Sequence, residues 1–283
     1  MNYDNRPIGV FDSGIGGLTV FNEIKKAMPD ETVVYFGDCG RAPYGIKSPE
    51  TILKFTFQDV RFLLGFDIKL MVIACNTASA YGYEQVSRTV DIPVVEVVGP
   101  GAACAITSTL NGKIGVIGTP ATIKSGVYEK AILKASSAPL NINILSKACP
   151  LFVNLVEEGW WDNEIAHMVA KEYLNDLFAS GIDTLVLGCT HYPLLERTIS
   201  KIAGGQVTLV NSAKEVALSV RQIISDGLVG GTNKFWCSEN TCCSDNNRYR
   251  FFTSDSVDKF QELSEKILGF TIDNIEKIDI EKY

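Results

Sequence analysis

The chain has 283 residues, 46% of them apolar and 21% charged, a composition that is typical of globular proteins and excludes extensive disorder. Its formal net charge is −7 and its lysines and arginines are scattered, so it offers no basic face to nucleic acid. No apolar run approaches the length of about 20 residues that spans a bilayer, and no secretion signal is recognisable, so we expect a cytoplasmic protein without membrane contact.

Strands and helices are predicted to alternate along the first hundred residues. The glycine turn DSGIGG follows the first strand, and the third strand delivers Cys75 to its carboxyl end, where a helix is expected to begin. In order, the elements are a strand at 8–11, a helix ending at Pro29, a strand at 32–38, a helix at 49–65, a buried strand at 69–74 and a short strand within 93–102.

The same pattern restarts near residue 113 and delivers a second cysteine, Cys189, to the end of a buried strand. A helix is again expected directly after this cysteine. In order, the elements are strand, turn and helix across 113–132, a strand at 141–150, a helix at 152–161, a helix at 163–180, a strand before Cys189, a strand and helix across 207–225, a strand at 248–253 and a helix at 256–268.

This alternation predicts an α/β fold with parallel sheets and right-handed crossovers. IGVFDSGIGG resembles IGVIGTPATI, and VIACNTAS resembles LVLGCTHY, which indicates an internal duplication. We expect two pseudo-symmetric lobes, each with a mainly parallel sheet flanked by helices, and an active site in the cleft between them. The first lobe is predicted to comprise residues 1–99 and 211–283, and the second residues 100–210.

Cys75 and Cys189 occupy matching positions in the two lobes. Backbone N–H groups and the positive end of a helix stabilise a thiolate at such a position. One buried cysteine alone is more often a small apolar residue, but a matched pair favours function. Moving an α-proton across an amino acid needs an acid and a base on opposite faces, and a thiol titrates near enough to neutrality to be either.

No lysine lies in the turns that follow these strands, so a pyridoxal cofactor is disfavoured. The pattern therefore predicts an amino-acid racemase that needs no cofactor and no metal. The eight cysteines are expected to be reduced. Of these, Cys237, Cys242 and Cys243 are irregularly spaced in a polar loop, and we interpret them as surface thiols rather than a zinc knuckle.

Polar residues follow two of the strand ends. Asp12 and Ser13 could hold the substrate ammonium and carboxylate groups, or simply cap the next helix. His191 could tune Cys189 or shuttle its proton, although a lone histidine is more often structural. Glu157 could orient His191 or face solvent.

One further loop, RAPYG, contains Tyr44 and Gly45. Its backbone amides could bind a second carboxylate of the substrate. Tyr44 could equally be a packing residue.

Six motifs between Ile8 and Leu195 resemble, in order, the glutamate racemase family within the aspartate/glutamate racemase superfamily: IGVFDSGIGGLTV, VVYFGDCGRAPYG, VIACNTASA, GVIGTPATIKSG, ACPLFVNLVEEG and LVLGCTHYPLL. The resemblance implies a cofactor-free, homodimeric enzyme of the bacterial cytoplasm. Such an enzyme interconverts L- and D-glutamate and supplies D-glutamate for peptidoglycan.

The resemblance also implies roles for particular residues. Cys75 would deprotonate D-glutamate and Cys189 would deprotonate L-glutamate, while Asp12, Glu157 and His191 would assist proton transfer. The implied substrate-binding residues are Asp12, Ser13, Tyr44, Gly45, Asn76, Thr77, Thr119, Thr122, Thr190 and His191. The chain departs from the family pattern at Cys39 and Gly40, where Thr and Ala are usual.

Three alternatives stay open. A sister racemase with the same thiols could act on aspartate or a hydantoin. A metal-dependent hydrolase could use Cys75, Cys189, His191 and Asp12 as ligands. A protein with this fold could also bind a ligand without catalysing any reaction.

Overall fold

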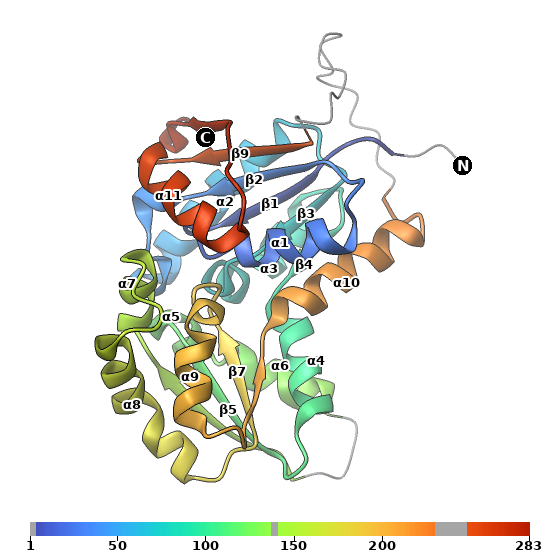
Figure 1. Cartoon of the computed structure of the whole chain (residues 1–283). Coiled ribbons are helices and arrows are strands. Elements are labelled where there is room, and N and C mark those ends of the chain that lie inside the picture. Colours follow the sequence, from blue (N-terminus) through green and yellow to red (C-terminus); the bar gives the residue numbers. More distant parts are fainter. Residues whose placement is uncertain (1–3, 137–140, 230–247) are drawn as a thin grey trace.

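A computed structural model describes residues 4–136, 141–229 and 248–283, which form two lobes, each with its own parallel sheet (Figure 1). The first sheet has the strand order β10-β9-β2-β1-β3-β4 and the second β6-β5-β7-β8. The strands of the first sheet are β1 (Ile8–Asp12), β2 (Val33–Gly37), β3 (Leu70–Ile73), β4 (Val94–Glu96), β9 (Tyr249–Thr253) and β10 (Ile275–Lys277). Those of the second are β5 (Lys113–Gly118), β6 (Asn143–Ala148), β7 (Thr184–Gly188) and β8 (Thr208–Val210).

Helices cover both faces of each sheet. The first sheet is covered by α1 (Leu18–Ala27), α10 (Ser212–Ser225) and α11 (Val257–Leu268) on one face and by α2 (Pro49–Leu64) and α3 (Asn76–Thr89) on the other. The second is covered by α4 (Val98–Ser108) and α6 (Val127–Ala135) on one face and by α7 (Leu151–Glu157), α8 (Glu164–Ala179) and α9 (Glu196–Ala203) on the other. The predicted α/β architecture with two parallel sheets is confirmed.

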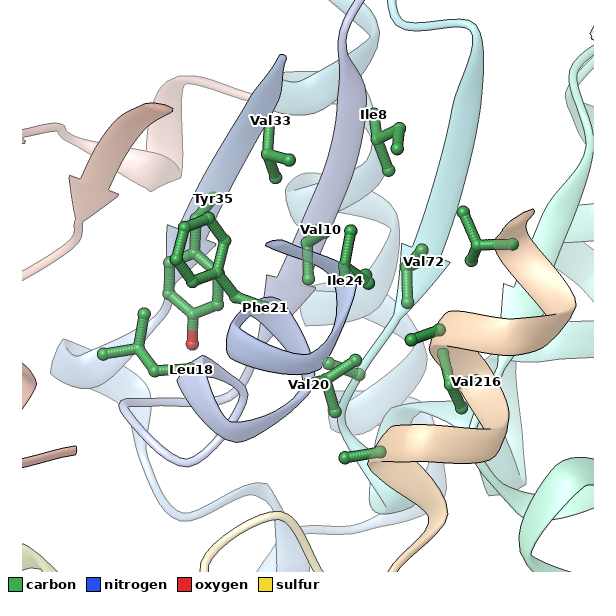
Figure 2. Close-up of a cluster of buried hydrophobic side chains, with 14 of the residues drawn as sticks. Ile8, Val10, Leu18, Val20, Phe21, Ile24, Val33, Tyr35, Val72 and Val216 are labelled. Carbon is green, nitrogen blue, oxygen red and sulfur yellow. The ribbon is translucent and has the colours of Figure 1, made fainter. Parts of the chain in front are cut away.

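Strand periodicity explains this two-sided burial. Ile8 and Val10 of β1 point to the α1 face, whereas Phe11 points to the α2 face, because successive strand side chains alternate between faces. Figure 2 shows the α1 side, where Phe21 and Ile24 pack on the sheet. Both faces are apolar, as is usual for parallel sheets covered by helices.

The structure corrects several predicted elements. β10 was not predicted, because it is short and largely exposed. The helix expected up to residue 132 is broken into α5 (Pro120–Ser125) and α6 by Gly126, which has φ 65°. The strand expected within 93–102 ends at Glu96, and Pro100 lies inside α4.

Helices α4 and α10 contact each other where the chain passes between the lobes. Val98 and Ala102 of α4 pack with residues of β5 and β7, whereas Val216 and Val220 of α10 pack with residues of β1 and β3. Helix α4 therefore packs on the second lobe and α10 on the first, and each follows the segment in which the chain passes from one lobe to the other.

No helix among the described residues is long and apolar enough to cross a membrane. Cys237, Cys242 and Cys243 lie outside the described residues.

Candidate active site

Cys75 lies at the carboxyl end of β3 and caps α3. Its sulphur accepts a hydrogen bond from the backbone N–H of Ala78 at 3.5 Å and donates one to Ser13 Oγ at 3.3 Å. Ser13 follows β1, the neighbouring strand in the sheet. The parallel register therefore brings both strand ends, and both side chains, to one place.

The surroundings of Cys75 favour the thiol over the thiolate. Burial, reinforced by the negative charge of Asp12, raises the pKa of Cys75 to about 12, although the hydrogen bonds with Ser13 and Ala78 act in the opposite direction. The stabilisation of a thiolate by the helix end, which the sequence suggested, is therefore outweighed here by desolvation.

Cys189 lies at the carboxyl end of β7, where Tyr128 and the carbonyl of Ile117 leave no room for a side chain on Gly188. The helix expected directly after it is absent. Instead, the backbone N–H of Tyr192 donates to the carbonyl of Cys189 at 3.0 Å, and Tyr192–Leu195 form a 3₁₀ turn before α9.

The partner of the Cys189 thiol is a histidine. His191 Nδ1 lies 3.8 Å from the sulphur, and its Nε2 lies 2.7 Å from Glu157 Oε1. Burial alone would disfavour the charged ring, but the hydrogen bonds with Cys189 and Glu157, together with their negative charges, raise the pKa of His191 well above its usual value. Although burial opposes it, the hydrogen bond and charge of His191 lower the pKa of Glu157.

Asp12 connects the two lobes through a hydrogen bond with Thr190. It is completely buried, and its carboxylate accepts hydrogen bonds from Thr190 Oγ1 at 3.1 Å and from the backbone N–H of Gly14 at 3.0 Å. Burial raises the pKa of Asp12, while the positive charge of His191 and the backbone and side-chain donors moderate the rise. Asp12 does not itself border the small cavity between the lobes that both thiols line.

Both thiols border a single small cavity between the lobes. The cavity is lined by Ser13, Pro43, Tyr44, Gly45, Cys75, Asn76, Thr77, Thr119, Val153, Cys189, Thr190 and His191. Its accessible volume is about 10 Å³, which is room for a single water molecule. In this arrangement of the lobes the cavity is too small to hold an amino acid.

Most of the sequence-predicted residues meet at this cavity. Asp12, Glu157 and Thr122 are one step removed, each in hydrogen-bond contact with a lining residue. Pro43 and Val153 were not predicted, since neither carries a polar group that would signal a site.

Threonine hydroxyls join the lobes on one side of the cavity. Thr77 of α3 lies 3.0 Å from Thr119 and 3.1 Å from Thr122, which themselves are 3.0 Å apart. Asn76 Nδ2 donates to Tyr128 Oη at 2.7 Å, a contact across the lobes that the sequence did not suggest.

Pro43, Tyr44 and Gly45 of the RAPYG loop line the cavity. The ring of Tyr44 is fully buried, and its hydroxyl points to Asp38 and Asp59. Gly45 is pressed so closely against Thr119 of the other lobe that a Cβ on it would lie 2.2 Å from the Thr119 Cβ. Only glycine allows this approach.

Within the described part of the chain, no group of three or more His, Cys, Asp or Glu side chains is arranged to hold a metal ion. The free cysteines here are Cys39, Cys75, Cys104, Cys149 and Cys189. Of these, Cys75 and Cys189 border the cavity between the lobes.

Comparisons with known proteins agree with this architecture. A glutamate racemase of Geobacter metallireducens is 46% identical over 277 residues, which is 98% of this chain and 97% of that protein. A crystal structure of glutamate racemase from Bacillus anthracis is similar with a TM-score of 0.87 and 40% identity, and covers 98% of both chains. One from Francisella tularensis, in complex with D-glutamate, has a TM-score of 0.86 and 38% identity over 99% of both chains. Residues 8–220 match the model of the Asp/Glu/Hydantoin racemase family, to which this chain belongs.

Proposed function

We propose that this protein is a glutamate racemase that transfers the α-proton between Cys75 and Cys189 without a cofactor. The single observation that carries the proposal is the presence of both thiols on one cavity between the lobes. A substrate bound there would have one sulphur available to each face of its α-carbon. This is the arrangement that inversion at that carbon requires.

The proton would move in one direction as follows. With L-glutamate bound, the Cys189 thiolate removes the α-proton, and the Cys75 thiol donates its proton to the opposite face of the α-carbon. D-glutamate leaves with Cys75 ionised and Cys189 protonated, and exchange with solvent restores the resting state. The reverse reaction exchanges the two roles.

The charges around the thiols support these resting states. Burial raises the pKa of Cys75 and so favours its protonated form, whereas His191, whose pKa is raised well above its usual value, lies 3.8 Å from the Cys189 sulphur. Glu157 in turn holds His191 in the charged form and in the required orientation. Asp12 would assist by fixing Thr190 and the turn that contains Ser13.

Glutamate is the substrate that the site supports best. The resemblance to glutamate racemases implies that Tyr44 and Gly45 bind the substrate together with the polar residues around the thiols. We place the distal carboxylate at the backbone amides of the RAPYG turn. Local donors of this kind are needed because the net charge of −7 gives no long-range attraction for an anion. The named relatives are glutamate racemases, and one of them is described in complex with D-glutamate.

We further propose the cellular setting and the chain organisation that the family resemblance implies. The enzyme acts as a homodimer in the bacterial cytoplasm and supplies D-glutamate for peptidoglycan. Its first lobe comprises residues 1–99 and 211–283 and its second residues 100–210, which agrees with the membership of the two sheets.

The test is to incubate the purified protein with L-glutamate or L-aspartate, without added cofactor, and to follow the circular dichroism of the amino acid. We expect the signal of L-glutamate to decay to zero, unchanged by EDTA. Faster decay with aspartate contradicts the substrate assignment, and loss of activity with EDTA favours the metal-dependent alternative. No decay with either amino acid supports a non-catalytic binding protein.

A further inference from the structure

A buried charged cluster lies next to the Tyr44–Gly45 turn, away from the cavity, and includes Arg41, the first residue of the RAPYG loop. It consists of Asp38, Arg41 and Asp59, which come from the end of β2, the following loop and α2. Both carboxylates are fully buried, and the Arg41 side chain is 11% exposed. None of the three borders the cavity, and the proposed proton transfer does not use them.

One guanidinium serves both carboxylates. Arg41 Nε donates to Asp38 Oδ2 at 2.6 Å, and Nη2 donates to Asp59 Oδ1 at 3.0 Å. The guanidinium also lies 4.0 Å from the ring centre of Phe55. Cation–π contact and paired hydrogen bonds fix its plane, so the two acids are held at defined positions.

The hydroxyl of Tyr44 connects these acids to the turn. Its oxygen lies in close contact with Asp38 Oδ2 and 2.8 Å from Asp59 Oδ2. A hydroxyl has a single hydrogen and can satisfy only one ionised carboxylate. The second acid must therefore carry a proton of its own and donate it to the Tyr44 oxygen.

The neighbours of the two acids assign that proton to Asp59. Asp38 already accepts hydrogen bonds on both oxygens, from Ser254 Oγ at 2.7 Å and from Arg41. Burial and the charge of Asp38 raise the pKa of Asp59 well above its usual value. With Asp59 neutral, the buried charges of Asp38 and Arg41 cancel, as burial in low dielectric requires.

We propose that Asp38, Arg41 and Asp59 are positioning residues, which hold the Tyr44–Gly45 turn at the cavity through the Tyr44 hydroxyl, with one proton held between Asp59 and Tyr44. The proposal rests on the proposed function, because it assigns a substrate-binding role to the turn. Since none of the three contacts either thiol, displacing the turn weakens substrate binding more than it slows proton transfer.

The cluster is also tied to the end of the chain. Ser254 accepts a hydrogen bond from the backbone N–H of Gly40 at 2.9 Å, and Glu281 Oε1 accepts one from Arg41 Nη1 at 3.2 Å. The Glu281 side chain is 56% exposed, so its ion pair contributes little. This makes Glu281→Gln a matched control that removes one negative charge next to Arg41 without touching the buried acids.

The test compares KM and kcat of D-glutamate racemisation for Asp38→Asn, Tyr44→Phe, Asp59→Ala and Asp59→Asn. We expect the first three to raise KM by about tenfold, equivalent to about 1.4 kcal/mol of binding free energy, and to change kcat by less than about threefold. Asp59→Asn should rescue the defect of Asp59→Ala, because its amide donates to Tyr44 and accepts from Arg41 as a protonated acid does. Glu281→Gln should match the wild type.

The two parts of the proposal fail separately. An unchanged KM in Asp38→Asn and Tyr44→Phe overturns the positioning role, and an Asp59→Asn variant as defective as Asp59→Ala overturns the placement of the proton. If Asp38→Asn does not fold, Tyr44→Phe decides the first question, since it removes only a hydroxyl. Failure of the wild type to racemise glutamate contradicts the proposed function instead, and the same comparison is then made on the Kd of D-glutamate by calorimetry.

Discussion

The two cysteines of the cavity occupy equivalent strand ends but have different surroundings. Cys75 caps a long helix and hydrogen-bonds to Ser13, in a setting that keeps it protonated. Cys189 is followed by a 3₁₀ turn and lies beside a charged His191. The two cysteines therefore share a backbone position but differ in the side chains around them, which in the proposed mechanism makes Cys189 the base and Cys75 the acid toward L-glutamate.

The largest expected effect comes from the thiols themselves. Cys75→Ser or Cys189→Ser should lower kcat in both directions by at least about 10³-fold, because a serine hydroxyl is far too weak an acid and base to replace a thiol. The measurement is racemisation of each enantiomer, with circular dichroism of the protein as the check on folding.

Cys149 provides the matched control. It too follows a strand end, β6, and is completely buried, but it does not border the cavity. Cys149→Ala should retain racemisation within about twofold, as volume-reducing changes of this small size act on stability rather than on a remote reaction. An active Cys189→Ser variant, or an inactive Cys149→Ala variant that is folded, contradicts the assignment of the thiols.

A second prediction concerns closure of the lobes. Gly45→Ala should lower kcat/KM by about 10²-fold, because its methyl group would overlap Thr119 and hold the halves of the site apart by roughly an ångström. Gly65→Ala is the control, since Gly65 has helical φ and ψ and its new methyl group would meet only a carbonyl oxygen at 3.2 Å. Equal activity of the two variants would show that this contact is not needed.

A third prediction concerns His191 and Glu157, the residues beside Cys189. Glu157→Gln should lower kcat about tenfold, because the neutral amide no longer stabilises the charged His191, which is worth about 1.4 kcal/mol in the transition state. Glu157→Gln should also lower the pKa of His191, because the charge and hydrogen bond of Glu157 raise it. NMR of the histidine ring across a pH series measures this change. An unchanged pKa would separate Glu157 from the tuning of His191.

A fourth prediction concerns the pKa of the Cys75 thiol and leaves the protein unchanged. Because the pKa of Cys75 is raised to about 12, its thiolate is scarce at neutrality and increases tenfold with each pH unit up to that value. The rate of Cys75 alkylation by iodoacetamide, resolved by peptide mass spectrometry, should therefore rise about tenfold per unit between pH 7 and 10. A plateau below pH 9 would contradict the shift.

Much of the fold and most of the cavity follow from local sequence patterns. Buried apolar strands that end in polar or thiol residues identify the carboxyl edge of each sheet, and this placed Cys75, Cys189, Asp12 and Ser13 near one cleft. The place of each residue at a strand end follows from strand periodicity, and the meeting of the two strand ends at one cleft follows from the expectation that two similar lobes face each other.

Other features depend on tertiary contacts that no local pattern encodes. Tyr128 reaches Asn76 from the opposite lobe, and Val153 enters the cavity as an ordinary apolar helix residue. The pKa of Cys75 could not be predicted either, since desolvation and the charge of Asp12 outweigh the helix end only in the assembled site. The 3₁₀ turn after Cys189 likewise replaces a helix that periodicity favoured.

The most direct test of the two-thiol account is racemisation of L-glutamate in D₂O, with α-deuterium measured in both enantiomers during the first few per cent of conversion. If the proton leaves to Cys189 and a different proton arrives from Cys75, the D-glutamate formed carries deuterium while the remaining L-glutamate stays protonated. Deuterium appearing equally in both enantiomers, or D-glutamate that keeps its original proton, would mean that a single base serves both faces.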